Sequence, residues 1–259
     1  MNIHVIMRRV PDTEAALKFR GTAVNEEEVE FVVNPYDEYA VEQAIQLKEQ
    51  IANAAVCVWA VGPAPMDKQL KWALQLGADT AVRIWQDGFT DVSETAELAI
   101  FASLFNRRPF DVLFVGKKRI DHDSSALPFL LAEKLSVPVC PAAVAFAFDG
   151  EKGVIQAQGM LQNRQVTLSG PPPAIIACEK GLNQPRYPSL KAMMRARRKK
   201  IDSMAIADLG LQLDPQQARY PVKAFERPVL QRRAEILSGD AREKARHLAD
   251  IIAQDIKAL

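Results

Sequence analysis

The sequence predicts a doubly wound α/β fold, with a mainly parallel sheet and helices on both of its faces. Strand-like and helix-like patterns alternate through the first two-thirds of the chain, which is the order that βαβ units produce. The strand-like segments are short, continuous apolar runs rather than alternating ones, as expected for parallel strands buried on both faces. With 259 residues the chain is long enough to bury a full core.

The strands come first in this assignment because their apolar runs are the clearest. We predict buried strands at residues 3–7, 55–61, 80–85, 112–115 and 174–178. Residues 144–148 and 154–158, joined around Asp149-Gly150, predict a hairpin added to the sheet.

Helical patterns fill the intervals between the strands. We predict helices at residues 37–50, 66–76, 93–105 and 124–135, and Gly77 should end the second of them. The pattern changes after Gly210, so residues 1–210 are expected to form one domain. Residues 211–234 then read as an extended arm without periodicity.

A last helix is predicted at residues 240–258. Its apolar positions are Ala241, Ala245, Leu248, Ile252 and Ile256, which lie near one helical face. This helix could fold back onto its own sheet or lie on another subunit. Residues 211–259 are therefore treated as a C-terminal arm and helix.

Composition excludes several classes of function. The net charge of +1 gives no global case for binding nucleic acid or a membrane surface. The three cysteines are far apart in apolar runs and read as buried residues of a reducing compartment. Neither a signal peptide nor an apolar run long enough to span a bilayer is recognisable, so a cytoplasmic protein without membrane insertion is expected.

Catalytic and metal sites have little support in the sequence. Only three histidines are present, and neither a Walker A motif nor a G-x-G-x-x-G motif occurs. Asp121-His122-Asp123 is a poor metal-binding pattern, because adjacent residues rarely converge on one ion. We therefore expect neither a catalytic residue nor a metal.

Residues 179–200 are the most distinctive segment of the chain. Pro185 and Pro188 forbid a regular helix and predict a shaped loop, after which Ser189 is a candidate N-cap of a short helix. Six of the ten residues 191–200 are Lys or Arg. Apolar residues beside such a cluster suit docking onto an acidic partner. A core helix with a solvated basic end explains the same pattern equally well.

Two turns could hold a ligand, because ligands of open α/β sheets bind beyond the carboxyl ends of the strands. One is Gly116-Lys117 and the residues that follow up to Ser125, where a helix N-terminus is expected. The other is Asn34-Pro35-Tyr36-Asp37, in which Asp37 should cap the next helix. Capping alone would also explain these residues, since Ser and Asp commonly cap helices.

Four segments together resemble one known family. They read VNPYDEYAVEQAIQLKE (33–49), VGPAPMDKQLKWALQLGAD (61–79), GKKRIDHDSS (116–125) and GLNQPRYPSL (181–190). In this order they are similar to the β-subunits of electron transfer flavoproteins, and they cover most of the chain up to about Gly210.

The resemblance implies a nucleotide site and a docking site. It implies that AMP, or a second FAD in its place, contacts residues at the two turns and on two strands: Ile6, Asn34, Pro35, Tyr36, Asp37, Val61, Gly116, Lys117, Ile120, Asp121, His122, Asp123, Ser124, Ser125, Ala126 and Leu127. It implies partner binding by Tyr187, Leu190, Met193, Met194, Arg197 and Arg198. Ala126 and Pro128 depart from the family pattern, and so do residues 156–170, where a Gly-Gly turn is missing.

The function implied by the resemblance is that of an electron carrier rather than an enzyme. The chain would pair with an α-subunit that holds most of the FAD, with Asp12, Thr13 and Tyr36 near the flavin. The resemblance also implies that the C-terminal arm and helix at residues 211–259 pack on this α-subunit. Electrons would come from a flavin-dependent dehydrogenase, such as an acyl-CoA dehydrogenase of fatty acid oxidation, and pass to an acceptor such as a membrane quinone oxidoreductase. The alternative is a stand-alone adenine-nucleotide-binding enzyme or stress-type binding module of similar fold.

Overall fold

The computed structural model describes residues 1–12, 14, 18–20, 23–24, 29–89, 92–213, 234 and 236–253. The chain divides into two compact units, Met1–Lys223 and Ala224–Leu259, each of which is described by itself. The predicted arm at residues 211–234 lies mostly outside the described residues.

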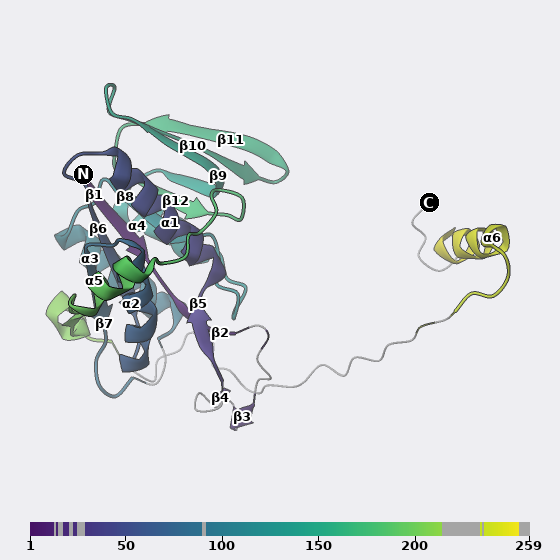
Figure 1. Ribbon diagram of the computed structural model, residues 1–259, viewed down its shortest axis with the longest axis horizontal. Helices are drawn as coiled ribbons and strands as arrows, with labels where there is room; N and C mark the ends of the chain where they lie inside the picture. Colours follow the sequence, from purple (N-terminus) through teal and green to yellow (C-terminus); the bar gives the residue numbers. More distant parts are fainter. Residues whose placement is uncertain are drawn as a thin grey trace. The chain divides into compact units, whose positions relative to one another are not determined.

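A single large sheet forms the centre of the first unit (Figure 1). In the part of the chain that the structure describes, nine strands are paired in the order β11-β10-β9-β12-β8-β1-β6-β7-β13. All neighbours from β9 to β13 run parallel, whereas β10 pairs antiparallel with both β9 and β11. The bounds are β1 Asn2–Ile6, β6 Ala55–Val61, β7 Thr80–Ile84, β8 Val112–Gly116, β9 Val139–Asp149, β10 Val154–Leu161, β11 Arg164–Gly170, β12 Ala174–Cys178 and β13 Asp202–Met204.

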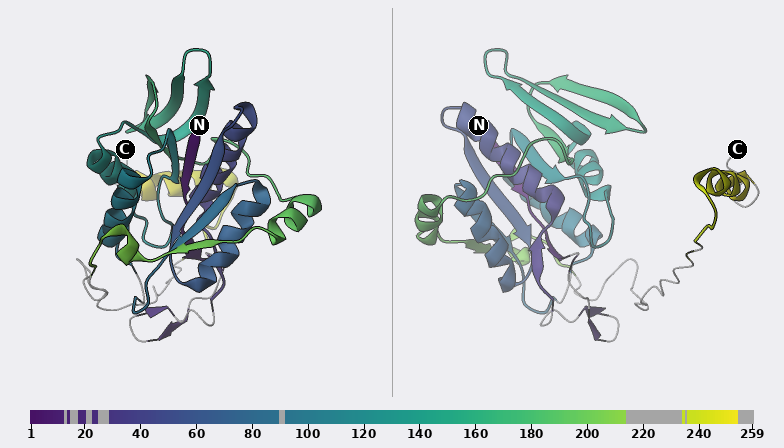
Figure 2. Two further views of the ribbon diagram at one scale, coloured as in Figure 1. Left: turned by 90° about the vertical axis from the view of Figure 1, so that its left-hand side faces the viewer. Right: turned by 45° about the vertical axis from the view of Figure 1, so that its right-hand side comes forward.

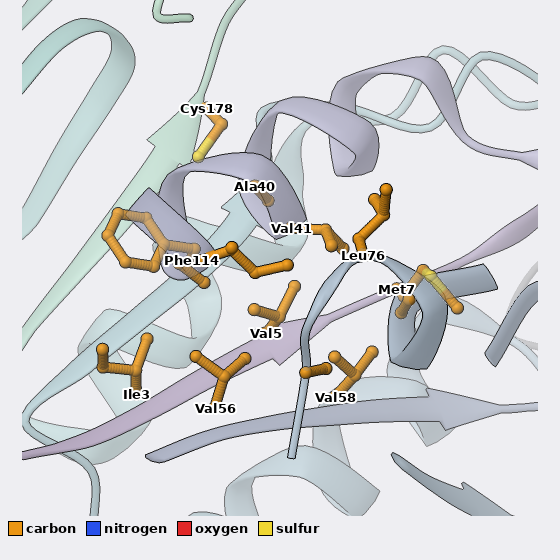
Figure 3. Close-up of a cluster of buried hydrophobic side chains, with 14 of the residues drawn as sticks. Ile3, Val5, Met7, Ala40, Val41, Val56, Val58, Leu76, Phe114 and Cys178 are labelled. Carbon is orange, nitrogen blue, oxygen red and sulfur yellow. The ribbon is translucent and has the colours of Figure 1, made fainter. Parts of the chain in front are cut away.

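Helices cover both faces of this sheet and create two cores. On one face lie α1 (Pro35–Gln50), α2 (Asp67–Leu76, after the short 3₁₀ helix Ala64–Met66) and α5 (Leu190–Arg197). Figure 3 shows Val5 and Val58 of the sheet beneath Val41 of α1. On the other face, α3 (Glu94–Arg107), α4 (Ala126–Leu135) and the 3₁₀ helix Ile206–Leu209 pack over Ile6, Leu113 and Ile175. Successive residues of a strand thus serve opposite cores, as the period of two requires.

The predicted doubly wound fold is confirmed, and most of its elements lie where they were expected. Gly77 ends α2 at φ 130°, a conformation that favours glycine, and Ser189 caps α5 by accepting a hydrogen bond from the Ala192 amide. Cys140 and Cys178 are buried, and Cys57 is half-buried.

Three predictions of local structure need correction. The hairpin is one part of a three-stranded antiparallel extension, because β11 was missed (Figure 2). The edge strand β13 was missed as well. Asp37 does not cap α1: Pro35 occupies the first helical position, so the N-cap falls on Asn34 and Asp37 lies inside the first turn.

Two small sheets lie apart from the central one. They pair β2 (Arg9–Pro11) with β5 (Phe31–Val33), and β3 (Phe19–Arg20) with β4 (Ala23–Val24). Within the second unit, α6 (Ala241–Ile251) begins with a capping box between Asp240 and Glu243 and buries none of its residues. The predicted last position, Ile256, lies outside the described residues. In the described part of the chain, every helix is too short or too polar to cross a membrane.

Candidate functional site

The candidate site lies at the point where the sheet reverses its order. β1 pairs with β6 on one side and with β8 on the other, so the chain runs outward in both directions from β1. In doubly wound sheets ligands bind at this switch point, beyond the carboxyl ends of the strands. Here those ends are followed by Arg8 after β1 and Lys117 after β8.

A buried ion pair holds the site together. Arg8 donates to both carboxylate oxygens of Asp37, from Nη2 to Oδ1 at 2.6 Å and from Nε to Oδ2 at 3.0 Å. The side chains of Arg8 and Asp37 are 3% and 0% exposed. Since two such charges tolerate burial only when paired and hydrogen-bonded, each residue requires the other.

The same two residues extend the contact to β8. Asp37 Oδ1 accepts the Gly116 amide at 3.0 Å, and Arg8 Nη2 donates to the Gly116 carbonyl at 2.8 Å. A Cβ on Gly116 would lie 2.2 Å from Asp37 Oδ1 and 2.8 Å from the Tyr36 carbonyl carbon. Only glycine fits where the start of α1 approaches the end of β8 this closely.

Asn34 links the two predicted turns directly. Its Nδ2 donates to the Lys118 carbonyl at 2.9 Å, and its Oδ1 accepts the Ile120 amide at 3.2 Å. Asn34 is fully buried, and its Nδ2 also donates to Asp37. The structure therefore brings the turns at residues 34–37 and 116–125 together, with Asn34 and Asp37 shaping the backbone of the second turn.

The loop after β8 is rich in charges that pair within the site. Lys117 forms an ion pair with Glu179, which follows β12, and Lys118 forms one with Asp123. Both ammonium groups lie over the Tyr36 ring, at 5.2 and 6.0 Å from its centroid. The hydrogen bond to Asp123 raises the pKa of Lys118. Both side chains thus place an ammonium group beside the aromatic ring.

Two carboxylates of α3, Glu94 and Glu97, lie next to this loop, which also contains the ion pair of Arg119 with Asp121. Arg119 forms two hydrogen bonds with Asp121, at 3.0 and 2.7 Å. Burial alone would raise the pKa of Asp121, but the bond and the charge of Arg119 lower it. Burial raises the pKa of Glu97, whose Oε2 lies 3.7 Å from Arg119 Nη1 and has no hydrogen-bond partner among the described residues. Ser124 donates to Glu94 at 2.5 Å.

The N-terminus of α4 closes the loop. Its N-cap Ser125 makes no side-chain cap bond, and the Ala126 amide has only a long bond of 3.4 Å to Ser124 Oγ. Pro128 contributes no N–H to this first turn. The remaining first-turn amides have no helical acceptor, which is the arrangement that favours an anion.

Other predicted contact residues lie nearby with their side chains in different environments. Ile6 and Leu127 are buried in the core beneath α3 and α4, and Val61 is half-buried at its edge. His122 is exposed, with Nε2 at 3.7 Å from Asp121. Asp12 follows β2, and Thr13 lies outside the described residues. Among the described residues, no cluster of three or more His, Cys, Asp or Glu side chains could hold a metal ion.

A second candidate surface lies on residues 187–198. We define the docking surface as Tyr187, Leu190, Met193, Met194, Arg197 and Arg198. Tyr187, Leu190 and Met194 are 95%, 78% and 68% exposed, whereas Met193 is half-buried. Leu190 is thus not part of the core, whereas Ala196 of the same helix is buried in it. Lys199 is not counted in the docking surface, because its ammonium group donates to the Ala78 carbonyl at 2.6 Å within the fold.

Sequence reasoning missed several residues of the site. Arg8, Glu94 and Glu179 lie outside the two predicted turns and contact Asp37, Ser124 and Lys117. Inside the second turn, Lys118 contacts Asp123 and Arg119 contacts Asp121, and Glu97 lies beside Arg119. Arg8 carried one usable signal: an arginine that directly follows an apolar strand requires a carboxylate if it is buried. The carboxylate lies 29 residues away, so no local pattern identifies it.

Comparisons with known proteins agree with one another. A family model described as "Electron transfer flavoprotein domain" matches residues 21–209. The chain is 31% identical to the electron transfer flavoprotein subunit beta of Bacillus subtilis over 266 residues, covering 100% of both chains. It is 32% identical to the subunit of the same name from Syntrophomonas wolfei, over 80% of this chain and 81% of the relative. The Methylophilus methylotrophus subunit is 27% identical, over 97% and 98%.

Proposed function

This chain belongs to the electron transfer flavoprotein family as a β-subunit, and on that premise we propose that it forms a heterodimer with an α-subunit and carries electrons from a dehydrogenase to an acceptor. The family name itself identifies a flavoprotein active in electron transfer. The donor is proposed to be a flavin-dependent dehydrogenase, such as an acyl-CoA dehydrogenase. The acceptor is proposed to be a quinone oxidoreductase of the membrane.

The observation that carries this proposal is the exposure of the docking surface. Tyr187, Leu190 and Met194 are large apolar side chains, all exposed and close together in the sequence, and a group of such side chains favours a protein interface. Exposed arginines lie beside them on α5. Aromatic, methionine and arginine residues are those enriched in protein interfaces. An apolar centre with a cationic rim suits transient docking of an acidic partner.

The switch-point site is proposed to bind an adenine nucleotide, namely AMP. One feature supports an anionic ligand there: the first turn of α4 lacks a side-chain cap from Ser125. Lys117 and Lys118 place their ammonium groups beside Tyr36 and already pair with Glu179 and Asp123. Asn34, Asp37 and Gly116 would act through the shape that they give to the loop. The residues present therefore fit a phosphate group, and Ala126 and Pro128 reduce the number of donors relative to the family pattern.

FAD is proposed to be held mainly by the α-subunit and to supply the redox chemistry when bound. This chain would contribute Tyr36, in the first turn of α1, and Asp12, directly after β2. The chain's own task is then to orient the heterodimer on its partner.

The test is co-expression with and without an α-subunit from the same family. We expect this chain alone to bind FAD poorly and a yellow heterodimer to form with the α-subunit, as measured by absorbance in the visible band of the flavin. Tight, stoichiometric FAD on the isolated chain would contradict the proposal. Purification as a flavin-free monomer that adenylates or hydrolyses a substrate would support the alternative of a stand-alone nucleotide-binding enzyme.

A further inference from the structure

The loop that precedes the docking surface has no regular secondary structure, yet it is firmly attached to α1. Residues 182–188 run across this helix between β12 and α5 (Figure 1). Pro185 and Pro188 fix two of its φ angles but contribute no N–H donors. The attachment therefore depends on side chains.

Arg186 makes most of these contacts. Its Nε lies 3.1 and 3.0 Å from the two oxygens of Glu42, and its Nη1 lies 2.6 Å from Glu49 Oε1. Its Nη2 donates to both carboxylates at 3.0 Å, and its backbone amide donates to Glu42 Oε2 at 3.2 Å. A planar guanidinium can satisfy two carboxylates in this way, whereas a lysine ammonium cannot.

A second contact fixes the start of the loop. Asn183 Nδ2 donates to the Tyr39 carbonyl at 3.0 Å and to Gln43 Oε1 at 3.1 Å. Tyr39, Glu42, Gln43 and Glu49 recur at helical spacing, so they line one face of α1. Glu42 is almost fully buried, with 2% of its side chain exposed, and so depends on Arg186 for charge compensation.

Arg186 is also the immediate neighbour of an exposed docking residue. Its side chain points onto α1, while the next residue, Tyr187, is 95% exposed and Leu190 follows three positions later. Pro185 and Pro188 lie close on either side of Arg186 and fix their own φ angles. Few free backbone torsions therefore separate Arg186, bound to Glu42 and Glu49, from the docking surface. A displacement of Arg186 therefore also displaces Tyr187 and Leu190.

We propose that Arg186 is the positioning residue of the docking surface: by closing on Glu42 and Glu49 together, it holds the loop in the one geometry that the partner recognises. This inference rests on the proposed docking function. It assigns to Arg186, Glu42 and Glu49 the pre-organisation of the loop, which lowers the ordering cost of binding. None of the three needs to touch the partner.

The test uses the complete heterodimer with its FAD, reduced by an acyl-CoA dehydrogenase. One variant is Arg186→Lys, which keeps the positive charge but loses the planar guanidinium that binds both carboxylates. The other is Glu49→Gln, which removes the charge of a half-exposed carboxylate and leaves Glu42 intact. Glu151→Gln, in the exposed turn between β9 and β10, is the matched control. Three quantities are measured: apparent KM and kcat for the heterodimer, melting temperature, and hydrogen exchange of the peptide 182–190.

We expect Arg186→Lys to raise the apparent KM by about tenfold and to accelerate exchange in the loop, with kcat and flavin spectrum nearly unchanged. The melting temperature should fall as well, because the buried Glu42 loses most of its bonds to the guanidinium. Glu49→Gln should shift KM and exchange in the same direction by less, and Glu151→Gln should shift neither. Faster exchange with an unchanged KM would overturn the inference, and so would a lower melting temperature with an unchanged KM.

Leu190→Ala, measured in parallel, distinguishes the two levels of the proposal. If Leu190→Ala raises KM while Arg186→Lys does not, the docking function survives and the positioning role of Arg186 is wrong. If Leu190→Ala also leaves KM unchanged, the docking function itself fails, and the positioning role fails with it.

Discussion

At the scale of single residues, the buried pair Arg8–Asp37 is the strongest determinant of the site's geometry, because it joins the ends of β1, α1 and β8. We expect Asp37→Asn to lower the free energy of unfolding by about 3–5 kcal/mol, since it leaves the Arg8 charge buried without a counter-charge. Urea unfolding measures this loss. The exposed pair Lys68–Glu30 is the control: Glu30→Gln should cost less than about 1 kcal/mol. Similar losses for both variants would contradict this role of the pair.

A second residue makes stability depend on pH. His4 accepts a hydrogen bond from Trp59 Nε1 at 2.9 Å, and burial, aided by the charge of Arg108, lowers its pKa from 6.5 to about 4. Between these two pH values, His4 is therefore protonated in the unfolded chain but not in the folded chain. As pH falls from about 6 to about 4, His4 should remove about 1.4 kcal/mol of stability per pH unit.

The variant His4→Gln isolates this contribution, because glutamine can accept from Trp59 but does not titrate. We expect its free energy of unfolding, measured by urea titration at several pH values, to fall less steeply than that of the original chain over this interval. Carboxylates contribute equally to both proteins, so the difference belongs to His4. Parallel pH dependences would show that His4 is already protonated in the folded state.

At the scale of elements, the contact between the start of α1 and the end of β8 tolerates no side chain at Gly116. Gly116→Ala should strongly destabilise the chain, because the added methyl group meets backbone and the Asp37 carboxylate rather than a movable side-chain tip. Gly170→Ala is the matched control, since nothing lies within 4 Å of the added carbon. Thermal melting of both variants tests this difference, and equal melting temperatures would contradict it.

The docking helix α5 gives the opposite expectation. Because Leu190 is exposed, Leu190→Ala should leave the melting temperature nearly unchanged while weakening flavin reduction by the dehydrogenase. Arg197 and Arg198 should act mainly on the association rate and on its salt dependence, as rim charges do. A loss of about 2–5 kcal/mol in stability, with normal reduction by the remaining folded protein, would restore the core reading of Leu190.

Local patterns predicted elements better than contacts between them. The strand at 174–178, the Gly77 stop and the Ser189 cap follow from apolar runs and backbone preferences, and all three are confirmed. β11 was missed because its turn, Gln162-Asn163, reaches positive φ without the glycine that usually signals such hairpins. Arg186, Glu42 and Arg8 have partners far along the chain, so only the fold brings them into contact.

At the scale of the whole molecule, a net charge of +1 conceals two surfaces of different character. The loop after β8 pairs its cations with Asp123 and Glu179 inside the site, whereas exposed cations of α5 remain available to a partner. Composition cannot reveal this difference, because it depends on which charges the fold neutralises. The general location of the site was predictable, since switch points follow from the order of strands and helices.

The last prediction concerns the nucleotide proposed for this switch point. Denaturing the purified heterodimer should release AMP in addition to FAD, as measured by chromatography of the supernatant.

Asp123 is proposed to support the site through its ion pair with Lys118, and it has a φ of 51°. Asp123→Ala would remove the carboxylate and also strain the backbone, whereas asparagine tolerates this conformation. If the ion pair positions Lys118 for the nucleotide, Asp123→Asn should lower the AMP content because that position is lost, and Asp149→Asn, in a surface turn, should leave it unchanged. Release of FAD alone, at one per heterodimer, would mean that the amides of α4 hold no nucleotide, in keeping with Ala126 and Pro128. Release of two FAD per heterodimer would instead assign the site to a second flavin.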